Sequence, residues 1–285
     1  MHPATRADLA WVAPPAVSAR IAGSVEELAA SREAEPWRVR VTDRGEAAIL
    51  GRWREHLDDC AVMGLWCSPA RVPVLMTDLL EVARAQGFAR LVGPLVSEGD
   101  AAPYLDAGLR VIERVIVMRM KPVRTVQATN VVDGLLLRKV APEDLDELLS
   151  LDAACFDPFW HYDAASLARL AHADRVAVAV LEGRIVGYTL CTLRAGDGSL
   201  GRLAVSVAFR RRGIGGTLVA DALDWLAANG ARNAVLSTQE DNTASRTLYR
   251  AMGFRETGDV LVACASGALS RPVRSEEAVA SCPDA

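Results

Sequence analysis

The chain is poor in lysine, in paired cysteines and in long apolar runs, and each shortage excludes a class of protein. Only two of its 32 basic residues, Lys121 and Lys139, are lysines, so a phosphate site here must be built from arginines and backbone amides. The net charge of -4 argues against nucleic acid or an anionic membrane as a partner. No apolar run reaches the length of a membrane span, and residues 1–20 lack the apolar core of a signal peptide. We therefore expect a cytoplasmic protein.

The cysteines do not indicate a disulfide framework or a metal site. None forms a CxxC pair, and no histidine lies near one at metal-ligand spacing, so we expect reduced, mostly buried thiols. They are Cys60, Cys67, Cys155, Cys191, Cys264 and Cys282. Apolar residues make up 51% of the 285 positions, which is enough to build cores for two domains of ordinary size.

An internal repeat divides the chain. The segment "TDLLEVARAQG" (77–87) matches "ADALDWLAANG" (220–230), and "YLDAGLR" (104–110) matches "YRAMGFR" (249–255), with Tyr, Gly and Arg at equal spacing. We therefore expect two copies of one fold. The expected parts are an N-terminal segment with a helix (1–35), a first, degenerate domain (36–124), a polar linker (125–134), a second, catalytic domain (135–265) and a flexible tail (266–285).

The second copy has the element pattern of an α+β domain. A strand at 134–140 precedes an amphipathic helix at 142–156, and a shorter helix is expected at 166–173. Two strands around a Glu-Gly turn follow, and a further strand ends at a glycine-rich turn. The helix at 213–230 comes next, then a strand and another helix, and the segment 254–265 is expected to close the sheet.

The stretch "AFRRRGIGGTLVA" (208–220) lies between that strand and that helix. Such a turn gathers free backbone N–H groups at the positive end of a helix, glycines allow close approach of an anion, and arginines add charge-assisted hydrogen bonds. The pattern predicts a ligand that carries phosphate. It is not a Walker A loop, because it has no lysine, and Leu218 stands where the dinucleotide fingerprint requires a third glycine.

The first copy lacks this turn. From Val207 to Asp221 there are fourteen positions, whereas from Pro69 to Asp78 there are nine. The remaining "ARVPV" places Pro73, which has no N–H group, near the helix start. We conclude that only the second copy keeps a phosphate site.

The pattern Arg-x-x-Gly-x-Gly, formed by Arg210, Gly213 and Gly215 and followed by "DNTASRTLYRAMGF" (241–254), resembles the GCN5-related N-acetyltransferase (GNAT) family. The resemblance covers about residues 134–265, with a degenerate copy in the first half. It implies an α+β protein of two tandem GNAT folds, each a mixed, mostly antiparallel sheet flanked by helices. It also implies an N-acetyltransferase that uses acetyl-CoA as co-substrate, without a metal.

The same resemblance assigns roles to individual residues. The glycines of the turn offer amides to the CoA pyrophosphate, and Tyr249 is the general acid that protonates the departing thiolate. Transfer is direct, so no nucleophilic cysteine is expected. The acetyl-CoA-binding residues that it implies are Leu203, Ala204, Val205, Arg210, Arg211, Arg212, Gly213, Ile214, Gly215, Gly216, Thr217, Asn242 and Ser245. Tyr104, the counterpart of Tyr249 in the first copy, faces no intact turn, and we expect it to be structural.

The general base is left open. Serines, Ser199 and Ser237, stand where members of the family carry a catalytic glutamate. The remaining candidates are Asp197, Glu240, Asp241, a chain of waters, or an amine that arrives already neutral.

The segment "CFDPFWHYD" (155–163) has two interpretations. Phe159, Trp160 and His161 line a pocket for the acceptor, or the aromatic side chains cap the core and the histidine has no role in function. The preferred acceptor is a primary amine of a small molecule. The alternatives are a protein N-terminus or lysine as the acceptor, and a non-catalytic sensor that binds acyl-CoA.

Overall fold

The computed structural model describes residues 1–268 except 13–23, 56–57, 129–131, 163–166 and 168–173. Apart from Leu167, the short helix expected at 166–173 lies outside the described residues, as do the tail from residue 269 onward, Cys282 and part of the expected linker. Below, residues 1–124 are called the first half and residues 125–285 the second half.

Thirteen strands of the described part form one sheet that passes through both halves. The strands of the first half are β1 (His2–Pro3), β2 (Val39–Val41), β3 (Ala47–Arg52), β4 (Asp59–Trp66), β5 (Arg90–Val92), β6 (Val96–Ser97) and β7 (Arg110–Met120). The strands of the second half are β8 (Leu136–Lys139), β9 (Arg175–Leu181), β10 (Arg184–Arg194), β11 (Asp197–Val205), β12 (Asn233–Gln239) and β13 (Arg255–Ala265). Their order is β1-β2-β3-β4-β5-β13-β7-β12-β11-β10-β9-β8, with β6 paired to β13.

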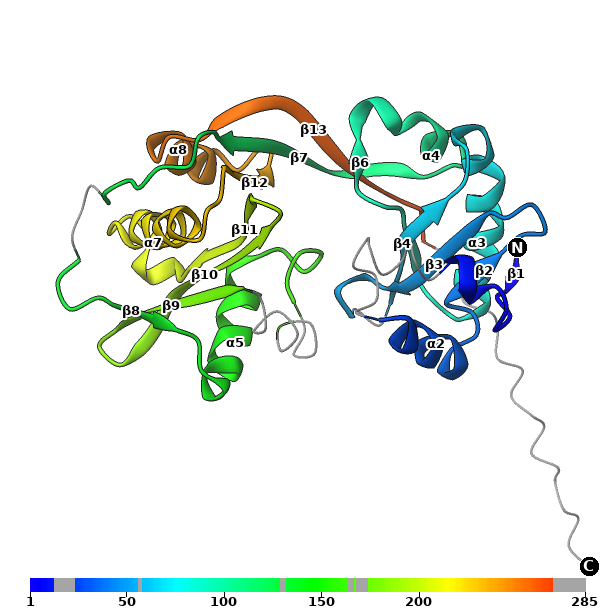
Figure 1. Ribbon diagram of the computed structural model, residues 1–285, viewed down its shortest axis with the longest axis horizontal. Coiled ribbons are helices and arrows are strands. Elements are labelled where there is room, and N and C mark those ends of the chain that lie inside the picture. Colours follow the sequence, from blue (N-terminus) through cyan, green and yellow to red (C-terminus); the bar gives the residue numbers. More distant parts are fainter. Residues whose placement is uncertain (13–23, 56–57, 129–131, 163–166, 168–173, 269–285) are drawn as a thin grey trace, which may run out of the picture.

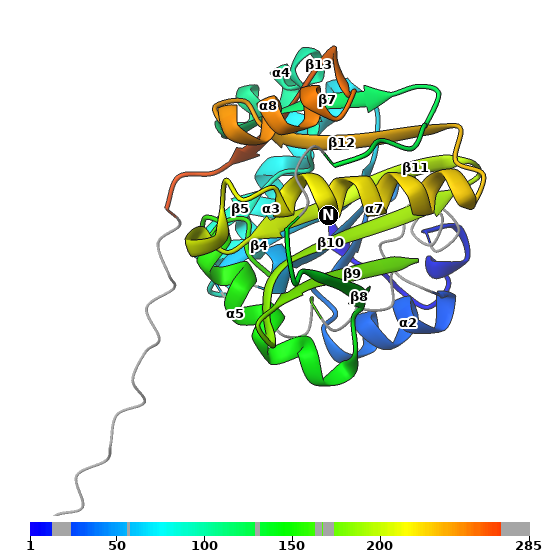
Figure 2. The ribbon, with the colours of Figure 1, turned by 90° about the vertical axis from the view of Figure 1, so that its left-hand side faces the viewer.

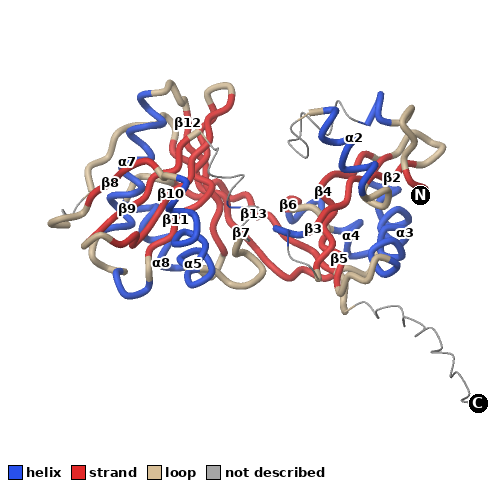
Figure 3. Tube along the Cα trace, turned by 90° about the horizontal axis from the view of Figure 1, so that it is seen from below, coloured by secondary structure: helices blue, strands red, loops and turns tan. Residues whose placement is uncertain are grey.

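Two long strands, β7 and β13, join two lobes of the molecule (Figures 1 and 3). Strand β7 leaves the first half and pairs antiparallel with β12 of the second half, from Ala234 opposite Met120 to Gln239 opposite Val115. Strand β13 runs the other way along β7 and reaches β5. The two halves therefore share one continuous set of backbone hydrogen bonds.

This exchange differs from the expectation that segment 254–265 closes the sheet of the second half. Strand β7 lies next to β12, and β13 lies beyond it. An open sheet edge offers unpaired N–H and C=O groups to any strand of matching length, and β7 is long enough to satisfy the edge of β12. A hydrophobic pattern identifies a strand without identifying the edge that it joins.

Helices cover both faces of the second half. The α-helices that lie wholly within the described part are α2 (Val25–Ala34), α3 (Val72–Ala85), α4 (Ala102–Asp106), α5 (Leu145–Cys155), α7 (Ile214–Ala228) and α8 (Thr243–Ala251). Tyr188 of β10 packs in the same cluster as Leu148 of α5, whereas Val186 packs with Leu218 of α7. Helices α5 and α7 thus lie on opposite faces of the sheet (Figure 2), which is why β10 is apolar over most of its length.

Short 3₁₀ helices occupy several connections. They are η1 (Trp53–Glu55), η2 (Pro69–Arg71), η3 (Glu98–Asp100), η4 (Pro142–Asp144) and η5 (Val207–Phe209). In the part of the chain that the structure describes, no helix combines the length and the hydrophobicity that a bilayer crossing requires.

A separate apolar cluster fills the space between the halves. Val92 and Val115 come from strands β5 and β7, Ala263 comes from β13, and Phe159 and Trp160 come from the segment after α5. The side chain of Trp53 packs against this cluster from η1. The aromatic segment of the second half is therefore held by the first half.

Candidate active site

The glycine-rich turn is shaped for an anion. It connects β11 to α7 through η5, and two of its residues, Arg211 (φ 61°) and Gly213 (φ 94°), adopt the left-handed conformation. Gly213 is the N-cap of α7 and has no side chain to satisfy the first amides. Among the described residues, none accepts a hydrogen bond from the backbone amides of 211–216. These amides surround the positive end of the 15-residue helix α7, which is a favourable position for a phosphate.

The arginines of the turn supply further positive charge. Arg210, Arg211 and Arg212 are exposed, and in the described part of the chain none lies within ion-pair distance of a carboxylate. The Nε of Arg210 donates to the carbonyl oxygen of Val205 over 3.1 Å, and the guanidinium of Arg212 lies 5.1 Å from the ring centroid of Phe209. The positive charge of the turn is therefore not compensated locally.

The glycines of the turn differ in what surrounds them. A Cβ on Gly215 would lie 3.2 Å from a methyl carbon of Leu248 on α8, so glycine lets the two helices approach closely. A Cβ on Gly216 would meet no atom within 4 Å. The hydroxyl of Thr217 donates to the carbonyl oxygen of Gly213 over 3.3 Å and would have to rotate to reach a phosphate.

Strands β11 and β12 part below this turn. They pair in parallel only from Asp197 opposite Asn233 to Ser199 opposite Val235, and beyond that point they diverge. A pocket of about 300 Å³ opens in the gap. Its lining residues are Arg54, Leu95, Val115, Phe156, Trp160, Ser199, Leu200, Gly201, Arg202, Leu203, Val235, Leu236, Ser237, Thr238, Gln239, Asn242, Ser245 and Tyr249.

The backbone of Leu203, Ala204 and Val205 borders this gap on one side. All three pair with β10 on the other side, from Leu203 opposite Thr189 to Val205 opposite Gly187. The carbonyl oxygen of Val205 is already engaged, since it accepts from the Cys155 thiol at 3.3 Å and from Arg210. Leu203, which also lines the pocket, is therefore the best placed of the three for a backbone contact with a ligand.

Helix α8 places three of the expected side chains on the pocket. Asn242 is its N-cap, and its Oδ1 accepts from the backbone amide of Ser245 over 3.1 Å. Tyr249 lies one helical turn after Ser245, and its side chain is buried, with the residue 6% exposed. Its ring centroid is 5.9 Å from that of Phe254, in an edge-on arrangement. Burial raises the pKa of the Tyr249 phenol above its ordinary value, so the phenol keeps its proton at neutral pH.

Sequence comparisons agree with this geometry. Residues 145–254 match the model of the family described as "Acetyltransferase (GNAT) family". The chain is 30% identical over 115 residues to the aminoglycoside N(6')-acetyltransferase type 1 of Salmonella typhimurium, a match that covers 35% of this chain and 79% of that enzyme. The chain belongs to the GNAT family.

Two further similarities bear on this member of the GNAT family. The chain is 31% identical over 134 residues to the mycothiol acetyltransferase of Clavibacter michiganensis subsp. michiganensis, covering 43% of each protein. It thus spans about two fifths of that relative's length. The tandem GNAT protein from the clavulanic acid biosynthesis pathway has a similar fold, with a TM-score of 0.60 at 19% identity over 80% of both chains. A tandem GNAT fold of the α+β class is therefore shown for this chain.

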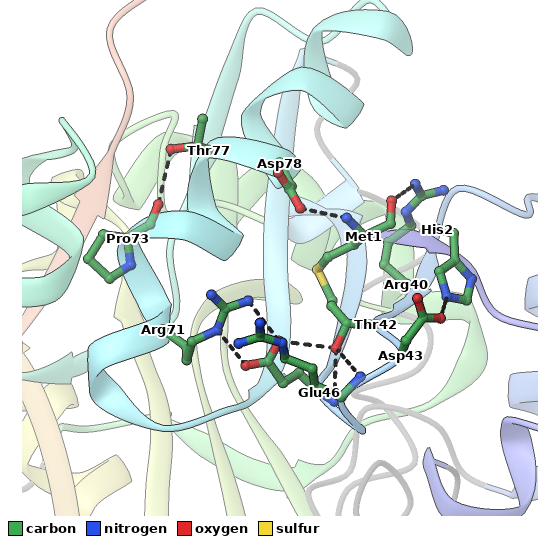
Figure 4. A network of polar contacts seen from close by, with 11 residues as sticks. Met1, His2, Arg40, Thr42, Asp43, Glu46, Arg71, Pro73, Thr77 and Asp78 are labelled. Atoms are coloured by element: carbon green, nitrogen blue, oxygen red, sulfur yellow. Dashed lines mark hydrogen bonds and ion pairs between the residues drawn. The ribbon is translucent and has the colours of Figure 1, made fainter.

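In the first half of this GNAT protein, the segment that corresponds to the turn carries an arginine paired with a carboxylate (Figure 4). Arg71, at the end of η2, donates through Nε and Nη2 to both carboxylate oxygens of Glu46, at 2.8 and 3.2 Å. Pro73 lies in the first turn of α3 and lacks an N–H group. Tyr104 is buried in the core of the first half. These contacts support the view that only the second half keeps a phosphate site.

The candidate bases do not reach the pocket. Among the described residues that line it, none is an aspartate or a glutamate. Asp197 accepts a hydrogen bond from Asn233 at 2.7 Å, and Glu240 forms an ion pair with Arg114 at 2.7 Å. Ser199 and Ser237, by contrast, both lie on the pocket wall. Among the described residues of the pocket wall, the charged side chains are those of arginines.

The residues of the aromatic segment do not all follow one of the two interpretations. Trp160 lines the pocket. Phe159 instead stacks on Trp53, with ring centroids 4.7 Å apart, and its carbonyl oxygen accepts from the indole nitrogen of Trp53. His161 is not among the described residues of the pocket wall, and its amide donates to the carbonyl oxygen of Asp157.

Sequence reasoning missed Arg54. This residue belongs to the first half, yet it lines the pocket of the second half. It lies in η1 with φ 49° and ψ 33°, a left-handed conformation that is uncommon for arginine. The degenerate copy has no motif around this position, so no local signal marked it. Groups of three or more metal-ligating side chains are absent from the described residues.

Proposed function

We propose that this chain is an acetyl-CoA-dependent N-acetyltransferase that transfers the acetyl group directly to the primary amine of a small molecule. The observation that carries the proposal is the gap between β11 and β12. Beside it lies the turn with free amides, and Asn242, Ser245 and Tyr249 line it together with Leu203. A phosphate-binding helix end and a protonated phenol are thus brought to one gap, as transfer from a CoA thioester requires.

The residues of the chain divide the chemistry between them. The amides of 211–216 would hold the pyrophosphate, and the free edge of β11 at Leu203 would hold the pantetheine arm. Acetyl-CoA supplies the thioester; its carbonyl carbon forms a C–N bond with the amine as the C–S bond breaks. Tyr249 then donates its phenolic proton to the departing sulfur, and the nitrogen, which loses one N–H proton as it becomes an amide, returns a proton to the Tyr249 phenolate.

Positive charge in the pocket affects the proton that an acceptor ammonium must lose before its nitrogen can attack the thioester. Arg54 lines the wall with no ion-paired carboxylate among the described residues, whereas Arg202 is paired with Asp152; uncompensated positive charge nearby disfavours the protonated form of an amine. An ammonium that enters the pocket is therefore driven to release its proton to water, with Ser199 and Ser237 available to hydrogen-bond that water. This agrees with an amine that reacts in its neutral form without a carboxylate base.

A small-molecule acceptor is supported in two ways. Two of the relatives are named for mycothiol and aminoglycosides. The pocket is also walled by both halves, has the size of a small-ligand site, and carries no acidic side chain among its described residues to attract a basic peptide. A protein N-terminus or lysine is therefore the second choice.

The test is a pair of measurements on the intact protein. Calorimetry with acetyl-CoA should show one site per chain, and a panel of primary amines should yield acetylated product and free CoA by mass spectrometry. Binding without turnover of any amine would favour a sensor. Two sites, or no binding, would contradict the assignment of a single acetyl-CoA site to the second half.

A further inference from the structure

Arg54 occupies an unusual position in the pocket wall. Its guanidinium carbon lies 4.4 Å from the ring centroid of Tyr162, 5.0 Å from that of Trp160 and 5.6 Å from that of Trp53. Three aromatic side chains from both halves therefore surround it, and each ring attracts the cation through its face. The left-handed backbone at this residue is retained despite its steric cost, which is typical of positions with a function.

The hydrogen-bonding capacity of Arg54 is met only in part. Its Nε and Nη1 are buried and have no hydrogen-bond partner. In the described part of the chain, no carboxylate forms an ion pair with it. Burial lowers the pKa of the guanidinium, with the positive charge of Arg202 acting in the same direction, and Tyr162 and Asp152 oppose that shift. A cation in this state gains from any anion that reaches it.

The second arginine of the pocket wall, Arg202, differs from Arg54 because it has an ion-pair partner within the fold. Arg202 is 7% exposed; its Nε and Nη2 donate to the two carboxylate oxygens of Asp152 at 2.9 and 2.8 Å, and Nη2 also donates to the carbonyl oxygen of Trp160. Its charge is compensated within the fold. The charge of Arg54 is not, so Arg54 is the arginine of the pocket that has capacity for a ligand.

We propose that Arg54 binds a carboxylate of the acceptor, so that the substrate is a primary amine that also carries a carboxylate group; this rests on the acetyl-transfer function proposed above. A single guanidinium suits a carboxylate, whereas phosphate sites usually combine several cations or a helix end. The turn at 208–220 already provides such a site for the CoA phosphates. The first half of the chain thereby contributes substrate recognition to a reaction that takes place in the second half.

Matched acceptors test the proposal. Glycine, β-alanine, L-aspartate and L-glutamate are each compared with the corresponding carboxamide, at fixed acetyl-CoA, by the rate of product formation. The wild type should prefer at least one acid over its amide. Arg54→Gln should lower kcat/KM for that acid by about 10- to 100-fold, mainly through KM, and abolish the preference, because charge-assisted hydrogen bonds contribute on this scale. Arg54→Lys should restore part of the preference.

A control variant separates recognition from stability. Arg52→Gln changes an arginine two residues away that pairs with Glu35 and does not line the pocket. It should leave the preference for the acid intact. The affinity for acetyl-CoA should be the same in the wild type, Arg54→Gln and Arg52→Gln, which shows that the variants are folded and that any loss concerns the acceptor.

Several outcomes would overturn the proposal. Equal use of acids and amides by the wild type would do so, as would a preference that survives Arg54→Gln. A faster reaction with succinyl-CoA than with acetyl-CoA that depends on Arg54 would mean that Arg54 binds a carboxylate of the acyl group instead. A preference for phosphoethanolamine as the acceptor would mean that Arg54 binds a phosphate. If no amine is acetylated, saturation-transfer NMR with L-glutamate decides: binding lost in Arg54→Gln supports a carboxylate site even if the proposed function fails, and no binding, or equal binding, refutes it.

Discussion

The indole nitrogen of Trp53 donates a hydrogen bond to the carbonyl oxygen of Phe159 over 2.7 Å, although 106 residues separate the two in the chain. Their rings are also stacked, at an interplanar angle of 18°. This contact holds the segment that carries Trp160 against η1, and it brings Arg54 into the same pocket wall. The first half, which lacks the glycine-rich turn, thus helps to form the wall of the pocket.

Trp53→Phe should test this relationship. The change removes the hydrogen bond and part of the stacked area, so we expect a loss of about 1–3 kcal/mol in the free energy of unfolding. The KM for the acceptor should rise while the affinity for acetyl-CoA is unchanged. Trp37→Phe is the matched control, since Trp37 packs on Phe88 within the first half. A rise in KM for both variants alike would mean that the contact has no specific role.

Gly216→Pro should weaken acetyl-CoA binding by about 10- to 100-fold, because it removes one amide from the turn and a hydrogen bond to a charged group contributes on this scale. Proline is tolerated in the first turn of a helix, where no helical hydrogen bond is lost. Gly216→Ala keeps the amide, and its added methyl group meets open space. Calorimetry should therefore show normal affinity for the alanine variant. Similar losses in both would indicate a steric effect rather than a lost donor.

Tyr249→Phe should lower kcat by about 10²- to 10⁴-fold and leave acetyl-CoA affinity unchanged, as expected for loss of a general acid. Tyr104→Phe makes the same change at the matching position of the first half, in a core that faces no intact turn. It should retain full turnover. A Tyr249→Phe variant that keeps its activity would indicate that solvent, and not Tyr249, protonates the departing thiolate.

The raised pKa of Tyr249 also predicts a pH dependence. The unfolded chain ionises tyrosine near pH 10, whereas the folded chain keeps this proton to higher pH. The contribution to stability is therefore complete below about pH 10 and is lost as the pH rises beyond it. Urea unfolding at pH 8 and pH 11 should show a larger loss of stability for the wild type than for Tyr249→Phe. The alkaline fall in kcat should likewise begin above pH 10.

Cysteine modification should leave the reaction intact. Burial raises the pKa of the Cys60 and Cys191 thiols to about 12, and it also raises the pKa of the Cys155 thiol beside the pocket. These thiols are protonated and unreactive at pH 8. Iodoacetamide at that pH should not reduce turnover, and mass spectrometry should find all three unlabelled. Rapid loss of activity with labelling of Cys155 would instead point to a cysteine in the chemistry.

The sequence by itself determined the parts of this protein that are local in the chain. The turn at 208–220 and the helix that carries Asn242, Ser245 and Tyr249 are recognisable because a helix repeats every 3.6 residues and a tight turn needs glycine at set positions. Spacing along one continuous segment then fixes which groups face the same way. The repeat at 77–87 and 220–230 indicated two copies for the same reason.

Only the tertiary structure decided which edges pair and what completes the pocket. The pairing of β7 with β12 depends on an open edge and a strand of matching length, and neither is encoded at short range. Once these strands pair, residues as distant as Arg54 and Tyr249 share one wall. Arg54 carries no motif because its role depends on what lies around it: three rings, an arginine already paired with Asp152, and the absence of a carboxylate among the described residues of the pocket wall.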